Sequence, residues 1–119
     1  MKLLVVEDEE AIRDLIVQTL QGAGHEVETA VDGLDALQAL SQATPDAILL
    51  DVNMPRMNGL EVLGRLSQDP ATREIPVVML TALSSSDDIR KAIQLGARDY
   101  IGKPFQVRQL LRRIDRLAA

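Results

Sequence analysis

The sequence contains no cysteine and no tryptophan among its 119 residues, and its aromatic side chains are limited to Tyr100 and Phe105. Without cysteine, the chain can form neither disulfides nor thiolate metal sites. With so few rings, the core has to be built from aliphatic side chains. No stretch approaches the roughly 20 consecutive apolar residues of a transmembrane helix. We therefore expect no membrane contact.

A positive charge excess is also missing, since the formal net charge is -5 at pH 7. A general nucleic-acid binder needs a basic surface, so we expect no direct contact with nucleic acid. The N-terminus passes from a short apolar run straight into acidic residues, without the long apolar segment and cleavage site of a secretory signal. These features, with 46% hydrophobic and 26% charged residues, predict one cytoplasmic domain over residues 1–119.

Short apolar runs alternate with longer segments of helical spacing. The runs occupy residues 3–6, 27–31, 47–50, 77–80 and 100–101. Runs as apolar as 47–50 and 77–80 are typical of parallel strands covered on both faces, whereas the alternating run 27–31 suits an edge. The pattern predicts an α/β fold, a (βα)5 flavodoxin-like open parallel sheet with strand order 2-1-3-4-5 and helices on both faces.

The intervening segments predict five helices, whose apolar positions lie within residues 12–20, 34–40, 60–66, 89–93 and 107–117. Leu15 and Val107 belong to the apolar sides of the first and the last helix, so we expect both to face the sheet. The outward arginines of the last helix predict a solvated charged face and no binding site; they are Arg108, Arg112, Arg113 and Arg116.

Polar residues stand where four of the predicted strands end. Glu7 and Asp8 follow the first strand, Asp51 ends the third, Thr81 the fourth and Lys103 the fifth. Ligands of open parallel sheets bind beyond the carboxyl ends of the strands, where the strand order reverses. With the order 2-1-3-4-5, the first and third strands are neighbours, and the three carboxylates should converge.

Three converging carboxylates repel one another and need a cation, or a proton on one of them. Mg²⁺ fits, because it prefers oxygen ligands and is held by only one or two carboxylates together with water. Thr81 would add a hydroxyl group and Lys103 a positive charge. Together, these groups form a site for a phosphoryl group, and a carboxylate can itself be the nucleophile.

Each of these residues also has an ordinary structural explanation. Glu9 and Glu10 are best explained as solvated partners of the next helix's N-terminus. Taken alone, Asp51 could merely end a strand, Thr81 could cap a helix, and Lys103 could be a surface lysine. The argument for a site is their joint placement on one edge of the sheet.

Four motifs resemble the receiver domains of two-component response regulators. They are LVVEDE at 4–9, LDVNMPRMNG at 50–59, LTA at 80–82 and YIGKPF at 100–105. The motifs occur in the order and spacing of that family, and the resemblance covers the whole chain. It implies a single receiver domain that works as a phosphorylation-dependent switch. Such a domain assists its own phosphorylation and dephosphorylation, and it is not a turnover enzyme on external substrates.

By this resemblance Asp51 is the phosphoacceptor. The resemblance implies Mg²⁺, with Mn²⁺ as a substitute, held directly by Asp8 and Asp51, through water by Glu7, and by the backbone carbonyl of Asn53. Lys103 would pair with the phosphoryl oxygens.

The resemblance also implies a switch. Thr81 would hydrogen-bond a phosphoryl oxygen, the ring of Tyr100 would follow it inward, and the surface of the fourth helix, fifth strand and fifth helix would repack. The small Ala82 would leave the acceptor open to a bulky donor, and the Lys103–Pro104 bond is expected to be cis.

The partners implied are a sensor histidine kinase or a histidine phosphotransfer protein as donor, and a downstream protein or tethered effector domain as output. A weak or phosphorylation-dependent homodimer is also compatible with the resemblance. Arg98 and Asp99 replace the paired acids that often precede the tyrosine in the transcription-factor branch, which argues against that branch's particular dimer.

Two other classes compete with this interpretation. A phosphohydrolase of the haloacid-dehalogenase type also uses an aspartate nucleophile, but it needs a second aspartate as acid and base where this chain has Asn53. A flavodoxin-like cofactor module needs a hydroxyl- or glycine-rich phosphate loop after the first strand. The acids at 7–10 stand there instead, and few aromatic side chains could stack a flavin.

Overall fold

The structure is a computed structural model that describes residues 1–82 and 86–118. Its parallel sheet has the order β2-β1-β3-β4-β5, as predicted. The strands are β1 (Lys2–Val6), β2 (Glu26–Ala30), β3 (Ala47–Asp51), β4 (Val77–Ala82) and β5 (Asp99–Lys103). The helices that alternate with them are α1 (Glu10–Gly22), α2 (Gly33–Gln42), α3 (Gly59–Gln68), α4 (Ser86–Gln94) and α5 (Val107–Ala118).

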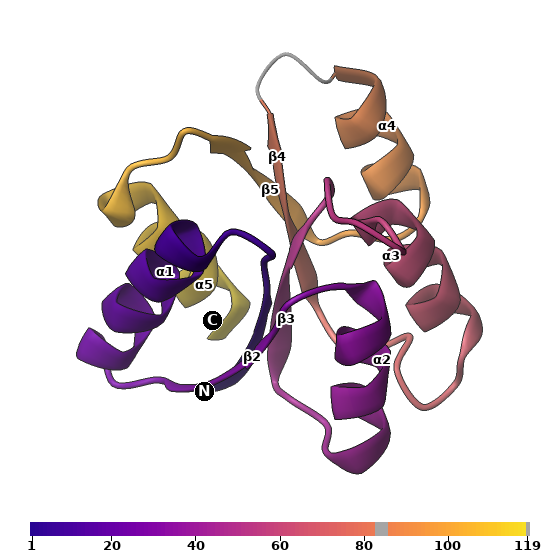
Figure 1. Cartoon of the computed structure of the whole chain (residues 1–119), viewed down its shortest axis with the longest axis horizontal. Coiled ribbons are helices and arrows are strands. Elements are labelled where there is room, and N and C mark those ends of the chain that lie inside the picture. Colours follow the sequence, from indigo (N-terminus) through magenta and orange to yellow (C-terminus); the bar gives the residue numbers. More distant parts are fainter. Residues whose placement is uncertain (83–85, 119) are drawn as a thin grey trace.

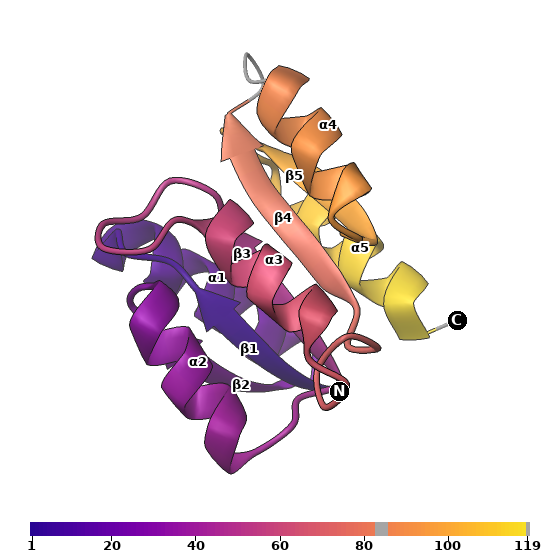
Figure 2. The same ribbon diagram turned by 90° about the vertical axis from the view of Figure 1, so that its right-hand side faces the viewer.

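Helices cover both faces of the sheet, which confirms the predicted architecture. Helices α1 and α5 pack on one face, and α2, α3 and α4 on the other (Figures 1 and 2). Successive side chains of a strand point to opposite faces, so Leu4 and Val6 of β1 belong to the core under α2–α4, while Leu3 and Val5 belong to the core under α1 and α5. None of the helices in the described part of the chain could span a membrane.

Two helical side chains predicted to face the sheet are exposed. Leu15 of α1 keeps 45% of its surface exposed and Val107 of α5 keeps 40%, so both predictions were wrong. Successive helical residues are separated by about 100° around the axis. Because Ile16 is fully buried, its neighbour Leu15 is turned away from the sheet. In α5 the buried positions are Leu110 and Ile114, one turn and two turns beyond Val107.

The arginines of α5 are only in part the solvated face that the sequence predicts. Arg113 is half-buried, and its Nη1 atom lies 2.7 Å from Oδ1 of Asp99 in β5. Arg116 lies at the edge of the same contact, with Nη1 3.9 Å from Oδ2 of Asp99. Arg108 and Arg112 are exposed, as predicted. The prediction for Arg113 was wrong because α5 packs beside β5, a proximity that the spacing of the arginines does not encode.

Glycines let α3 approach the end of β3, and α2 the loop that follows it, very closely. A Cβ atom at Gly59, the first residue of α3, would lie 2.1 Å from the carbonyl oxygen of Asp51. A Cβ atom at Gly33, the first residue of α2, would lie 2.7 Å from the carbonyl oxygen of Met57. These neighbours are backbone atoms, which cannot rotate away. The starts of α2 and α3 are therefore packed directly against the segment that follows β3.

Substituting Gly59 with alanine tests this approach. We expect Gly59→Ala to lower the free energy of unfolding by about 1–3 kcal/mol or more, because its methyl group would overlap the backbone of Asp51. The control is Gly64→Ala in the same helix, where a Cβ meets nothing within 4 Å. This variant should gain about 0.5–1 kcal/mol. Urea denaturation followed by circular dichroism measures both, and equal free energies for the two variants would contradict the close packing.

Candidate functional site

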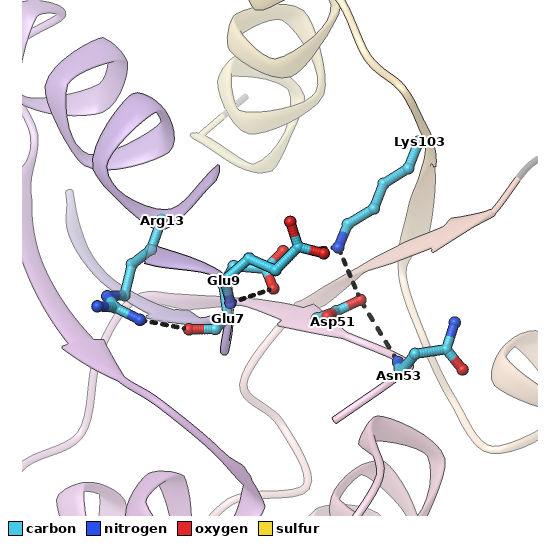
Figure 3. Close-up of polar contacts among 6 residues, drawn as sticks. All are labelled: Glu7, Glu9, Arg13, Asp51, Asn53 and Lys103. Carbon is cyan, nitrogen blue, oxygen red and sulfur yellow. Dashed lines mark hydrogen bonds and ion pairs between the residues drawn. The ribbon is translucent and has the colours of Figure 1, made fainter. Parts of the chain in front are cut away.

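Strand alternation brings three charged residues to one place. Asp51 is the last residue of β3, Lys103 is the last residue of β5, and Glu7 directly follows β1. Each of them stands two residues after a member of the core under α1 and α5, and residues two apart in a strand point to the same face. These core residues are Val5, Leu49 and Ile101. All three side chains therefore lie on the same side of the sheet at its carboxyl edge, as Figure 3 shows.

Lys103 joins two buried carboxylates. Its Nζ atom lies 2.6 Å from Oε1 of Glu7 and 3.1 Å from Oδ1 of Asp51 (Figure 3). Glu7 is fully buried and Asp51 is only 2% exposed. Such a site combines charge with low solvent access, so its electrostatic interactions are strong.

Backbone groups hold the same carboxylates in place. The N–H of Glu9 donates to Oε2 of Glu7 at 3.2 Å, and the N–H of Asn53 donates to Oδ1 of Asp51 at 3.4 Å. From α1, the Arg13 guanidinium donates to the carbonyl oxygen of Glu7 at 3.0 Å (Figure 3). The segments after β1 and β3 are thus ordered around the two acids.

The predicted cluster of carboxylates is present. One carboxylate oxygen from each of Glu7, Asp8 and Asp51 lies within 4.8 Å of the others. Asp8 is exposed, unlike the other two, so the cluster opens to solvent on its side. A single ammonium group, that of Lys103, does not neutralise three carboxylates. Oxygen donors with excess negative charge are the ligands that a hard divalent cation such as Mg²⁺ prefers, so these residues fit the ion that the sequence predicts.

Burial and neighbouring charges shift the pKa values of Glu7, Asp51 and Lys103. Burial, together with the Glu7 carboxylate, raises the pKa of Asp51 to about 7, although Lys103 opposes the shift. Burial also opposes ionisation of Glu7, but hydrogen bonds from Lys103, Asp51 and the Glu9 amide hold the pKa of Glu7 below its ordinary value. Burial disfavours the charge of Lys103 too, yet the two carboxylates raise its pKa. The closer contact with Lys103 explains why Glu7 is the more acidic partner.

Thr81 and Tyr100 lie on the other face of the sheet. Thr81 stands two residues after Met79 in β4, and Tyr100 of β5 pairs with Met79 in register. Met79 belongs to the core under α2–α4, and Tyr100 is half-buried against that core. Thr81 is buried, and the hydrogen bond found for its hydroxyl in the described chain is a long one, 3.5 Å to the carbonyl of Ala82. Ala82 pairs in register with Lys103, so all four predicted strand ends meet at one edge.

An ion pair beside the site was not foreseen from the sequence. Asp32 caps α2, accepting from the N–H of Asp35 at 2.9 Å, and its other oxygen accepts from Nε of Arg56 at 2.9 Å. The Asp35 amide and the Arg56 guanidinium hold the pKa of Asp32 below its ordinary value. An aspartate just before a helical segment is a readable cap signal. Nothing in the sequence around Arg56 indicates its partner.

Comparison with known proteins assigns the family. A family model described as the response regulator receiver domain matches residues 3–115. The chain belongs to this family. The DNA-binding dual master transcriptional regulator RpaA of Synechocystis is 42% identical over 123 residues, which cover 98% of this chain and 51% of RpaA. The chain spans about half the length of the curated relatives that it matches.

Solved receiver structures have the same fold. The chemotaxis protein CheY4 of Vibrio cholerae is 38% identical, with a TM-score of 0.91 over 98% of this chain and 97% of that one. The receiver domain of NtrX from Brucella abortus is 36% identical, with a TM-score of 0.91 over 97% and 96% of the two chains. The cis Lys103–Pro104 bond that the resemblance implies is present in this receiver domain.

Removing the charge of Asp51 should stabilise the metal-free receiver domain at high pH. The pKa of Asp51 is higher in the folded chain, at about 7, than its ordinary 3.8, so the folded state binds the proton more tightly. The contribution of Asp51 to the free energy of unfolding therefore falls as the pH rises from 3.8, its ordinary pKa, to about 7, its pKa in the folded chain. In EDTA at pH 8, we expect Asp51→Asn to be more stable than the unaltered chain by about 1–3 kcal/mol.

Denaturant unfolding at pH 4 and pH 8 measures this effect, which should almost vanish at pH 4. The matched control is Asp14→Asn on the exposed side of α1. A stability difference of the same size at both pH values would show that burial of the Asp51 charge is not its cause.

Proposed function

We propose that this receiver domain accepts a phosphoryl group on Asp51 and thereby switches a signalling surface. The observation that carries the proposal is the buried Asp51 carboxylate, which shares the Lys103 ammonium with Glu7 at an otherwise acidic edge. A nucleophile with a neighbouring cation and a metal-binding acid cluster suits phosphoryl transfer, in which charge spread over three oxygens has to be neutralised.

Mg²⁺, or Mn²⁺ in its place, would be held directly by Asp8 and Asp51 and through water by Glu7, with the backbone carbonyl of Asn53 as a further ligand. The support is the convergence of the three carboxylates within 4.8 Å. When bound, the cation supplies positive charge that stabilises the transferring phosphoryl oxygens. It also relieves the repulsion between Glu7 and Asp51 and favours the ionised, nucleophilic form of Asp51.

In the transfer, an Asp51 carboxylate oxygen forms a bond to phosphorus while the bond from phosphorus to the donor's imidazole nitrogen breaks. The departing nitrogen keeps the bonding electron pair and takes up a proton. Lys103, now shared between Glu7 and Asp51, would pair with a phosphoryl oxygen. Ala82, beside Lys103 in the sheet, presents only a methyl group to the incoming donor.

The switch would run through Thr81 and Tyr100. The hydroxyl of Thr81 makes only a long hydrogen bond within the described chain, so it can turn towards a phosphoryl oxygen at little energetic cost. Tyr100 lies on the same face of the sheet and packs against the core under α4. Movement of Thr81 would free space for the Tyr100 ring and repack the surface of α4, β5 and α5, a two-state change biased by local charge.

The donor would be the phosphohistidine of a sensor histidine kinase or of a phosphotransfer protein, met in the cytoplasm. The output would be a downstream protein or a tethered effector domain, as the length of the curated relatives suggests. The net charge of -5 supports an output without direct nucleic-acid contact by this domain. A weak or phosphorylation-dependent homodimer stays a prediction. Within the chain, Asp99 of β5 pairs with Arg113 of α5, on the surface that the switch would repack.

Labelling tests the acceptor. Incubation with acetyl phosphate and Mg²⁺ should add one phosphate per chain, released by hydroxylamine and detected by intact mass. Asp51→Asn and chelation of the metal should each abolish it, because one removes the nucleophile and the other removes the neutralising cation. Asp14→Asn, which removes an exposed acid, should label normally. Equal labelling of Asp51→Asn would refute the assignment, and many turnovers on small phosphoesters would support a phosphohydrolase instead.

The intrinsic fluorescence of the chain tests the switch, because Tyr100 is its only tyrosine and tryptophan is absent. Phosphorylation should change the Tyr100 emission as its ring moves. In fully labelled Thr81→Ala the change should be lost, whereas Thr81→Ser, which keeps a hydroxyl, should retain it. Thr44→Ala, at an exposed site on the opposite edge, is the matched control. An unchanged response in Thr81→Ala would refute the coupling.

A further inference from the structure

The loop after Asp51 contains a strained turn. Arg56 has φ 66°, and it is the one non-glycine residue with positive φ in the part of the chain that the structure describes. The N–H of Met57 donates to the carbonyl oxygen of Pro55 at 2.7 Å, across Arg56. A three-residue turn with positive φ at its centre is a rare and strained γ-turn. Glycine would adopt this conformation without a steric penalty, so the arginine calls for an explanation.

The Arg56 side chain offers one. Its guanidinium makes a two-nitrogen contact with Oδ2 of Asp32, through Nε at 2.9 Å and through Nη2. The Asp32 side chain is only 6% exposed, whereas that of Arg56 is 60% exposed. Asp32 is also fixed, because its other oxygen caps α2. An exposed ion pair contributes little to stability, but this pair has one buried and immobile partner.

The turn lies between α2 and the proposed ligand Asn53. At the start of the loop, the Asn53 amide contacts Asp51, and at its end the N–H of Gly59 donates to the carbonyl of Val52 at 2.8 Å. Beyond the turn, the backbone of Met57 packs against Gly33 at the start of α2. Any relaxation of the turn at Arg56 would therefore be transmitted to the loop that carries Asn53.

We propose that Arg56 is a positioning residue for the cation site: by pairing with Asp32, it holds loop 52–58 in its strained conformation and keeps the ligands after β3 in place. This inference rests on the proposed function, since it assumes that Asp51 and the loop bind a divalent cation. It assigns to α2 a role in metal affinity, although no residue of α2 belongs to the acid cluster.

A Mg²⁺ titration followed by amide chemical shifts tests the inference. In Arg56→Ala, which keeps the strain and loses the pair, we expect the dissociation constant for Mg²⁺ to rise about tenfold, the size of effect typical when a group that orients metal ligands is removed. Arg56→Gly loses the pair but also the strain, so its rise should be smaller. Arg56→Lys keeps one charged contact and should recover part of the affinity. Arg65→Ala, in the exposed last turn of α3, should leave it unchanged.

A second measurement does not depend on metal. Hydrogen exchange at the Met57 amide, which closes the turn, should become faster in Arg56→Ala and in Asp32→Asn, and the double variant should exchange no faster than the single ones because both remove the same contact. Unchanged Mg²⁺ affinity in Arg56→Ala would overturn the inference, as would an equal loss in Arg65→Ala. A chain that binds Mg²⁺ but takes no phosphate on Asp51 would instead overturn the proposed function, so the two failures are distinct.

Discussion

The burial of Glu7 and Asp51 around the single ammonium group of Lys103 is the interaction on which the rest of the site depends. Two carboxylates removed from water repel each other strongly, and one lysine cannot satisfy both. The shorter contact with Glu7 leaves Asp51 as the group with the raised pKa. The site therefore has an excess of negative charge, which a divalent cation would neutralise in the proposed function.

The sheet makes this arrangement feasible through its two faces. The side chains of Glu7, Asp51 and Lys103 lie on the face of the sheet that α1 and α5 cover. Those of Thr81 and Tyr100 lie on the face that α2, α3 and α4 cover. In the proposed switch, a charge change at the carboxyl edge would reach the opposite layer through Thr81 of β4. In the proposed function, this geometry would place the phosphoryl chemistry on one face of the sheet and the responding residues on the other.

The packing around the end of β3 adds a third constraint. Gly59 brings α3 against the carbonyl of Asp51, Gly33 brings α2 against Met57, and the Arg56–Asp32 pair ties the loop between them to α2. Loops ordinarily tolerate variation. This one is confined on both sides by backbone contacts, so its conformation is a property of three elements together and not of the loop alone.

The sequence by itself determined the alternation of strands and helices and the placement of Glu7, Asp8, Asp51, Thr81 and Lys103 at strand ends, and general rules of parallel-sheet topology supplied the strand order. Apolar runs of strand length, helical spacing between them and polar residues at the strand ends are local patterns that can be read along the chain. Only the tertiary structure decided that Lys103 bridges Glu7 and Asp51, that Arg113 pairs with Asp99, that Leu15 and Val107 face solvent, and that Arg56 reaches Asp32. The contacts join residues far apart in the chain and depend on side-chain reach. The exposure of Leu15 and Val107 depends on the rotation of each helix about its axis, and no local pattern encodes either property.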